Sequence, residues 1–294
     1  MELRHLQTFQ TIVKEGSFVQ AADRLGYAQS TITLHIQQLE SELGVKLFAR
    51  QGKKVQLTEA GQALEEQADQ LLQRANALQQ SMLDIVAGDA VHCRIGAIEP
   101  TASLRLPALL VQFYQQRPKV HLTLEVAGTL TISQRIVGGS LDIGICSPPP
   151  TYLNLVFEPL FVENMALLLP EHHPLASLET IRARDLDGQR LLLTEPGCAY
   201  RNVVENRILQ YGANPLRGIE IGSMGAIICM VQNGMGLAIV PETLATPVPT
   251  GTVLRHIHEV DLSLPVGLVY SPNITSPGRV LETLLASLRS HLRQ

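Results

Sequence analysis

The chain has 294 residues, of which 45% are hydrophobic and 17% are charged, and its formal net charge is −4. This composition can bury the cores of two or three domains, and it excludes an intrinsically disordered protein. The negative charge excludes a polycation, so any contact with nucleic acid must depend on a local basic segment.

The sequence also limits the cellular compartment of the protein and the kinds of metal or disulfide site that it can form. It contains no run of about 18 apolar residues, which a membrane-spanning helix needs. No long apolar stretch follows the first five residues, as it would in a secretory signal. The four cysteines are scattered and lack zinc-ligand spacing, which is typical of reduced thiols. We therefore expect a cytoplasmic protein with no membrane partner and no metal site.

The first 43 residues predict three helices, with a tight turn between the second and the third. Apolar residues recur three or four positions apart from Leu3 to Val13, which predicts a first helix with one buried stripe. Ser17 is the expected N-cap of the second helix, and Gly26 lies in the turn before a third helix over Gln29 to about Leu43. A short helix, a tight turn and an exposed polar helix form the geometry that inserts side chains into the major groove of DNA.

The third helix supplies the candidates for contacts to bases and phosphates, which are expected on its exposed face or at its start. They are Gln29, Ser30, Thr31, Thr33, Leu34, His35 and Gln38. Polar residues on a helix are usually only solvated surface, and it is the preceding helix and turn that favour a DNA role. His35 could equally be a neutral surface residue.

A basic segment follows the third helix. Gly52 fits the turn of a hairpin, and the residues up to Leu57 fit its return strand. No acidic residue interrupts the segment from Lys46 to Lys54. We expect a wing in which Arg50, Lys53 and Lys54 bind the DNA backbone without reading its sequence.

Residues 58–86 predict one long helix, because no glycine or proline occurs after Gly61. Its apolar positions are spaced by four and three residues in alternation, which favours pairing with another helix. These positions are Leu64, Ala68, Leu71, Ala75, Leu78, Met82 and Ile85. The alternative is a lone amphipathic helix packed on its own domain, which normally has a wider apolar stripe.

After Gly88 the pattern changes to strands that alternate with helices. The expected strands cover residues 93–98, 120–126, 141–145, 165–169, 190–194, 218–221, 237–240 and 265–270. The expected helices include residues 103–116, 131–137 and 277–292. Repeated βαβ units imply parallel sheets with helices on both faces. About 200 residues therefore predict two similar α/β lobes.

A ligand cleft is expected between the lobes, at the carboxyl ends of the parallel strands, where helix N-termini favour anions. The candidate residues at these ends are Thr101, Ser103, Thr129, Cys198, Arg201, Ser223 and Met224. The hydroxyl groups and Arg201 could hold a small carboxylate, although simple N-capping would also explain the serines and threonines. Glu99 could pair with Arg201 or Arg135, or bind the amine of a ligand.

The sequence resembles the LysR-type transcriptional regulators over its whole length. The resemblance is most specific in the first 61 residues, and further matches lie in the second half. The matching segments are Leu6–Phe9, Gly16–Phe18, Ala21-Ala22, Leu25, Gln29-Ser30, Leu39-Glu40, Gly44-Val45, Leu47-Phe48, Arg50, Leu57–Gly61, Leu141–Ile145, His173–Ala176 and Val231–Leu237 with Val240-Pro241.

The resemblance implies an α/β protein with a winged helix-turn-helix over residues 1–58, a dimerising linker helix over 59–88 and an effector-binding domain over 89–294. That domain would be of the periplasmic-binding-protein-like (type II) kind, with lobes at about 91–163 plus 265–294 and at about 164–264. The implied partners are double-stranded promoter DNA, a small-molecule effector, a second copy in a dimer or tetramer, and RNA polymerase. No cofactor besides the effector and no catalytic activity are expected.

Two positions need separate comment. Members of this family often carry Ser and then Arg in the middle of the recognition helix, where this chain has Thr33 and Leu34. Leu34 cannot clamp guanine or phosphate, so a contact to a thymine methyl is expected instead. Peroxide-sensing members use a reactive cysteine in the effector domain, but no resolving thiol lies near Cys198 in the sequence, which favours an inert thiol.

Two rival classes share part of this pattern. A solute-binding protein for transport would have the same two lobes, but it needs an export signal and no DNA-binding module. A small-molecule enzyme could use the cleft, but the sequence offers no convergent acid, base or nucleophile. We therefore predict a sequence-specific, ligand-controlled transcriptional regulator.

Overall fold

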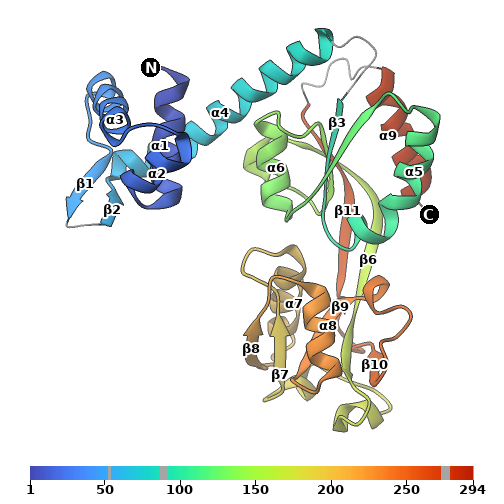
Figure 1. The fold of residues 1–294 in the computed structure, drawn as a ribbon. Coiled ribbons are helices and arrows are strands. Elements are labelled where there is room, and N and C mark those ends of the chain that lie inside the picture. Colours follow the sequence, from blue (N-terminus) through green and yellow to red (C-terminus); the bar gives the residue numbers. More distant parts are fainter. Residues whose placement is uncertain (52–53, 87–91, 273–278, 294) are drawn as a thin grey trace. The chain divides into compact units, whose positions relative to one another are not determined.

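The computed structural model describes residues 1–51, 54–86, 92–272 and 279–293, and these residues form two compact units (Figure 1). The first unit contains residues 1–86, and the second begins at residue 92. Each unit encloses its own hydrophobic core. Within the described ranges, no helix is long and apolar enough to cross a membrane.

Three helices build the core of the first unit: α1 (Leu3–Glu15), α2 (Phe18–Leu25) and α3 (Gln29–Leu43). The Oγ of Ser17 accepts a hydrogen bond from the amide of Gln20, so the predicted N-cap is confirmed. Gly26 ends α2 with a φ of 69°, a left-handed conformation that a glycine adopts at little cost. The predicted helix-turn-helix is therefore present, and α3 begins and ends where the sequence predicts.

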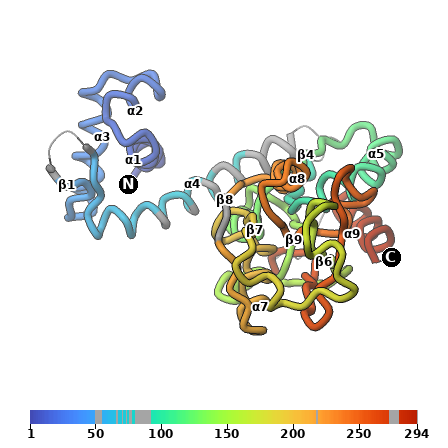
Figure 2. Tube along the Cα trace, turned by 90° about the horizontal axis from the view of Figure 1, so that it is seen from below, coloured from blue at the N-terminus to red at the C-terminus, as the bar shows by residue number. Residues whose placement is uncertain are grey.

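A two-stranded wing and a long helix complete this unit. Strands β1 (Phe48–Gln51) and β2 (Lys54–Leu57) pair antiparallel, and α4 (Glu59–Val86) follows as a helix of 28 residues (Figure 2). A Cβ on Gly61 would lie 2.2 Å from the carbonyl oxygen of Leu47. Gly61 thus lets the start of α4 approach the chain that enters the wing.

The first part of the predicted seam on α4 faces the protein's own domain. Ala68 is buried in the core of the first unit, and Leu64 packs against that core. Gln10 on α1 donates a hydrogen bond of 2.6 Å to the carbonyl oxygen of Glu65. Leu64 and Ala68 therefore follow the alternative of packing on the protein's own domain, whereas Leu78 is 63% exposed, and pairing with a second helix stays a prediction. The side chains of Met82 and Ile85 lie outside the described residues.

The described residues of the second unit form a mixed α/β structure with nine strands. Its strands are β3 (His92–Ala97), β4 (His121–Val126), β5 (Ile143–Cys146), β6 (Val156–Pro170), β7 (Arg190–Leu193), β8 (Leu216–Glu220), β9 (Leu237–Pro241), β10 (Thr252–Arg255) and β11 (Ser263–Tyr270). Its α-helices are α5 (Leu106–Gln116), α6 (Thr129–Val137), α7 (Ala199–Gln210), α8 (Met224–Gln232) and α9 (Arg279–Leu292). Short helical turns include the π-helix η1 (Thr101–Arg105) and the 3-10 helix η5 (Glu242–Ala245).

The strand order is β4-β3-β5-β11-β6-β9-β7-β8, with β10 paired to β6. Pairs among β3, β4 and β5 are parallel, as are those of β7 with β8 and β9. Strands β6 and β11 run antiparallel to their neighbours, so the prediction of purely parallel sheets is wrong. Strand β6 spans both lobes, and it pairs antiparallel with β11 in the first lobe and with β9 and β10 in the second.

Strand β6 has 15 residues. Its first part pairs with β11 as far as Asn164, and from Met165 it pairs with β9 in the second lobe (Figure 1). The apolar pattern predicts residues 165–169 as a strand but not residues 156–164. The polar side chains of Glu158, Glu163 and Asn164 interrupt the apolar pattern in that missed part.

Candidate DNA-binding surface and effector site

The recognition helix α3 presents most of the predicted residues to solvent. Gln29, Ser30 and Gln38 are exposed, and Leu34 is 51% exposed. Thr31 and Thr33 are half-buried, and the Thr33 hydroxyl donates to the carbonyl oxygen of Gln29. The helix begins after Ala28 with no side-chain cap, so its first amide groups are open to an anion such as a phosphate.

His35 is an exception, because it is only 7% exposed and faces α1. Its Nδ1 lies 2.9 Å from Oγ1 of Thr8, and its ring packs against the rings of His5 and Tyr27. The Thr8 hydroxyl donates its hydrogen to the carbonyl oxygen of Arg4, so His35 must donate to Thr8. Burial lowers the pKa of His35, and the neighbouring His5 lowers it further. The expectation of an exposed His35 is therefore wrong.

The helical period explains this orientation. His35 lies three residues after the buried Ile32 and four before the buried Leu39, so it continues the inner face of α3. The polarity of His35 favours a solvent-exposed side chain. Its position on the same helix face as Ile32 and Leu39 instead directs the side chain into the core.

Glu40 is a residue of this surface whose role the sequence analysis missed. Its buried carboxylate accepts a hydrogen bond of 2.9 Å from the amide of Leu47 and one of 2.6 Å from Nζ of Lys46. Glu40 thereby ties the end of α3 to the chain that enters the wing. The signal was its spacing, because Ile32, Ile36 and Glu40 form one row of the helix. Residue Lys53 and the side chains of Arg50 and Lys54 lie outside the described residues.

In the second unit, the predicted hydroxyl residues follow the carboxyl ends of β3 and β4. Thr101 is fully buried, and Oγ1 of Thr129 lies 2.6 Å from Oγ of Ser147. Ser103 is exposed and donates to Glu99 at 2.5 Å. Glu99 is thus held by Ser103 instead of an arginine, and Arg135 pairs with Glu125.

Arg201 does not offer a free guanidinium group. Its buried side chain donates to the carbonyl oxygen of Thr194 at 2.7 Å and forms ion pairs with Glu220 at 2.9 Å and Glu205 at 3.2 Å. These contacts fasten α7 to β7 and β8. The expectation that Arg201 is available to a carboxylate effector is therefore corrected, because two carboxylates of the protein already occupy it.

The remaining predicted residues lie at the starts of α7 and α8. The exposed Ser223 accepts a hydrogen bond from the amide of Ala226, so it acts as an N-cap. Met224 is half-buried against the core. Cys198 is partly buried at the N-terminus of α7. These positions are consistent with simple capping and packing.

A polar cluster at the junction of the lobes was also missed. Glu163 of β6 is only 1% exposed, and its Oε1 accepts a hydrogen bond of 2.8 Å from Thr243 on η5. Its Oε2 lies 3.5 Å from Nη2 of Arg105 on η1, in the other lobe. The guanidinium of Arg105 lies over the ring of Phe161, 4.2 Å from its centre. One carboxylate on the crossing strand therefore contacts a side chain from each lobe.

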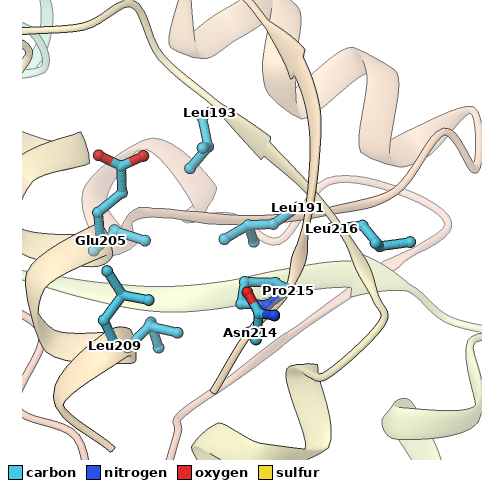
Figure 3. Close-up of a pocket in the computed structure, with 9 residues that line it drawn as sticks. Leu191, Leu193, Glu205, Leu209, Asn214, Pro215 and Leu216 are labelled. Atoms are coloured by element: carbon cyan, nitrogen blue, oxygen red, sulfur yellow. The ribbon is translucent and has the colours of Figure 1, made fainter. Parts of the chain in front are cut away.

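An apolar pocket lies away from this junction, in the second lobe. It is lined by residues of α7, β7 and the segment that enters β8, including Leu191, Leu193 and Leu216 (Figure 3). Glu205 is an acidic residue in its wall, and that carboxylate is paired with Arg201. The pocket is therefore an apolar feature of the second lobe and does not include the predicted effector residues.

Together, the two units define a DNA-binding protein that carries a two-lobed ligand domain. Residues 3–62 match the family model of the bacterial regulatory helix-turn-helix proteins of the lysR family, and residues 87–293 match the LysR substrate binding domain. The chain belongs to the LysR family of transcriptional regulators. It is a DNA-binding regulator with an effector-binding domain and not an enzyme.

Similar proteins cover its whole length. The HTH-type transcriptional regulator YtlI of Bacillus subtilis is 33% identical over 294 residues, which are 100% of this chain and 95% of that protein. GltR of the same organism is 30% identical, with 100% and 98% covered. The crystal structure of full-length CbnR with its target DNA matches with a TM-score of 0.68 and 22% identity, over 100% of this chain and 99% of that one.

Proposed function

We propose that this regulator binds promoter DNA through α3 and the wing as a dimer or tetramer, and that a small carboxylate controls it. The observation that carries the DNA-binding surface is the uncapped, solvent-exposed start of α3, where Gln29 and Ser30 adjoin open amide groups. The structure of CbnR in complex with its target DNA supports the same general arrangement. Backbone contacts by Arg50, Lys53 and Lys54, and a contact with RNA polymerase, stay predictions.

A gel shift at rising salt tests the DNA-binding proposal. Double-stranded DNA from upstream of the protein's own gene should be retarded, and the retardation should fade as counterions compete with the basic wing. Lys54→Glu should weaken binding to all sequences, whereas Gln29→Ala should weaken the native site more than a shuffled one. If Lys54→Glu and Gln29→Ala each weaken binding to the native and the shuffled site equally, the proposed division of roles between the wing and α3 is contradicted.

The strand ends of the first lobe support a carboxylate effector. Thr101 begins η1 after β3, and Thr129 begins α6 after β4, so hydroxyl groups accompany two helix starts. Ligands of open α/β sheets bind at such carboxyl ends, where free amide groups favour negative charge. Thermal-shift screens should find stabilisation by small carboxylates and none by neutral compounds of the same size. Stabilisation by the neutral compounds alone would refute this class.

Exposed apolar residues support self-association. On α4, Leu71 and Leu78 remain exposed beyond the part that packs on the helix-turn-helix. Strands β4 and β8 end the main strand order of the second unit, and each exposes apolar side chains, among them Val126 and Ile219. Monomeric proteins seldom leave such groups uncovered at sheet edges. Sedimentation at micromolar concentration should therefore show dimers or larger species.

A further inference from the structure

Three hydrogen-bond donors at the lobe junction are buried without an acceptor. Within the described part of the chain, Oγ1 of Thr101, the hydroxyl of Tyr200 and Nε of Arg105 have no hydrogen-bond partner. Thr101 is fully buried, and Tyr200 is only 5% exposed. Buried polar groups are nearly always paired in folded proteins, so three unpaired donors in one region need an explanation.

The three donors come from both lobes. Thr101 and Arg105 lie four residues apart on η1, a helix of one turn, which brings them to the same side of it. Tyr200 lies on α7 of the other lobe, and burial raises its pKa. The negative charge of Glu163 raises that pKa further, while the charge of Arg105 opposes it, so both charges of this ion pair act on the phenol.

The chemistry of the donors defines their missing partner. The Nε of arginine can only donate, and each hydroxyl has a hydrogen to donate. The partner must therefore offer several acceptor positions, as the two oxygens of a carboxylate do. Arg201, the other arginine considered for this role, is occupied by Glu205 and Glu220.

Glu163 adds a second requirement. Its Oε1 is held by Thr243, whereas its Oε2 has, among the described residues, one long contact of 3.5 Å to Arg105 and retains capacity to accept. A purely anionic ligand would meet this buried carboxylate at close range, where repulsion is strong. A ligand with an ammonium group beside its carboxylate satisfies both sets of groups.

We propose that Arg105, Tyr200 and Thr101 receive the carboxylate of an amino acid-like effector, whose ammonium group pairs with Glu163. This inference rests on the proposed function, and it replaces Arg201 by Arg105 as the anchor. The donor atoms are shielded from solvent in this structure.

Stability of the ligand-free full-length protein gives the first test. Tyr200→Phe and Thr101→Val remove an unpaired hydroxyl and keep the shape, so the melting temperature should stay the same or rise by up to about 2–4 °C. Tyr152→Phe and Thr151→Val are matched controls at exposed positions, and they should change nothing. A clear fall for both buried variants would overturn the proposal, because it would show that the hydroxyls have structural partners.

Ligand screening gives the second test, with the 20 amino acids and the acids that lack the amino group, such as alanine against propionate and glutamate against glutarate. At least one amino acid should stabilise the wild type more than its paired acid. Tyr200→Phe should lower the affinity for that amino acid by about tenfold or more. Equal affinity of the wild type and Tyr200→Phe for that amino acid would overturn the proposed set of donors. Stabilisation by the acids without an amino group alone would overturn the role of Glu163. If neither series binds, the carboxylate class of the proposed function fails as well.

Discussion

Replacing Glu40 should show whether the wing and the recognition helix act as one unit. The buried carboxylate of Glu40 accepts from the amide of Leu47, whose side chain is fully buried, and from the exposed Lys46. Glu40→Ala leaves the Leu47 amide without its acceptor, which costs about 1–3 kcal/mol. The exposed end of the Lys46 pair adds only about 0–1 kcal/mol. We therefore expect a loss of roughly 2–3 kcal/mol for Glu40→Ala, whereas Glu40→Gln, which keeps an acceptor, should lose about 1 kcal/mol.

The assay combines urea unfolding of the full chain, followed by circular dichroism at 222 nm, with DNA binding under conditions where all variants are folded. Because Glu40 fixes the start of the wing against α3, Glu40→Ala should weaken DNA binding even where the protein remains folded. Glu42→Gln is the matched control on the same helix, since Glu42 is exposed and pairs with the terminal amino group. If Glu40→Ala keeps both its stability and its affinity, the proposed coupling is refuted.

Three further changes test other parts of the structure. Leu78→Lys, at an exposed position of α4, should shift the protein toward monomers in sedimentation and weaken its binding to full promoter sites. If the variant still forms dimers to the same extent, α4 is excluded as the interface. Arg201→Met should lower the free energy of unfolding by about 1–3 kcal/mol, because Glu205, Glu220 and a carbonyl oxygen lose their donor, and an unchanged urea midpoint would show that these contacts contribute nothing. Burial lowers the pKa of His35 below its ordinary value of 6.5, so the stability of the first unit should be complete above about pH 6.5 and fall as the pH drops below it. His35→Gln should flatten this dependence in melting curves, and the same slope in both proteins would contradict it.

The sequence predicts those parts of the fold whose causes are local. Ser17 and Gly26 define the start and the end of α2 through their own conformations and hydrogen bonds. The third helix is fixed by apolar residues at a period that only a helix satisfies. These features could be predicted without any knowledge of distant partners.

The corrections concern polar residues whose partners are distant or unexpected. His35 and Glu40 lie on the buried face of α3, where contacts to Thr8 and Leu47 stabilise them. Arg201 on α7 is paired with Glu220, which lies 19 residues later in the chain on strand β8. Neither composition nor periodicity reveals such pairs, because they depend on how the elements pack.

The crossing strand β6 shows the same limit at the level of topology. Its central Glu163 interrupts the apolar pattern, yet it is buried because Arg105 and Thr243 approach it from the two lobes. Strand β6 pairs antiparallel with strands of both lobes, which no local pattern encodes. The candidate site therefore depends on contacts from both lobes, which the sequence alone does not reveal.

The most direct test of the account is the affinity of the full-length protein for duplex DNA from upstream of its own gene, measured against a shuffled duplex over a series of salt concentrations. We predict tighter binding to the native duplex by about tenfold or more at every salt concentration, and a linear fall of log affinity with log salt. Equal affinity for the two duplexes, or affinity that does not change with salt, would contradict the claim that α3 reads the bases while the wing holds the backbone.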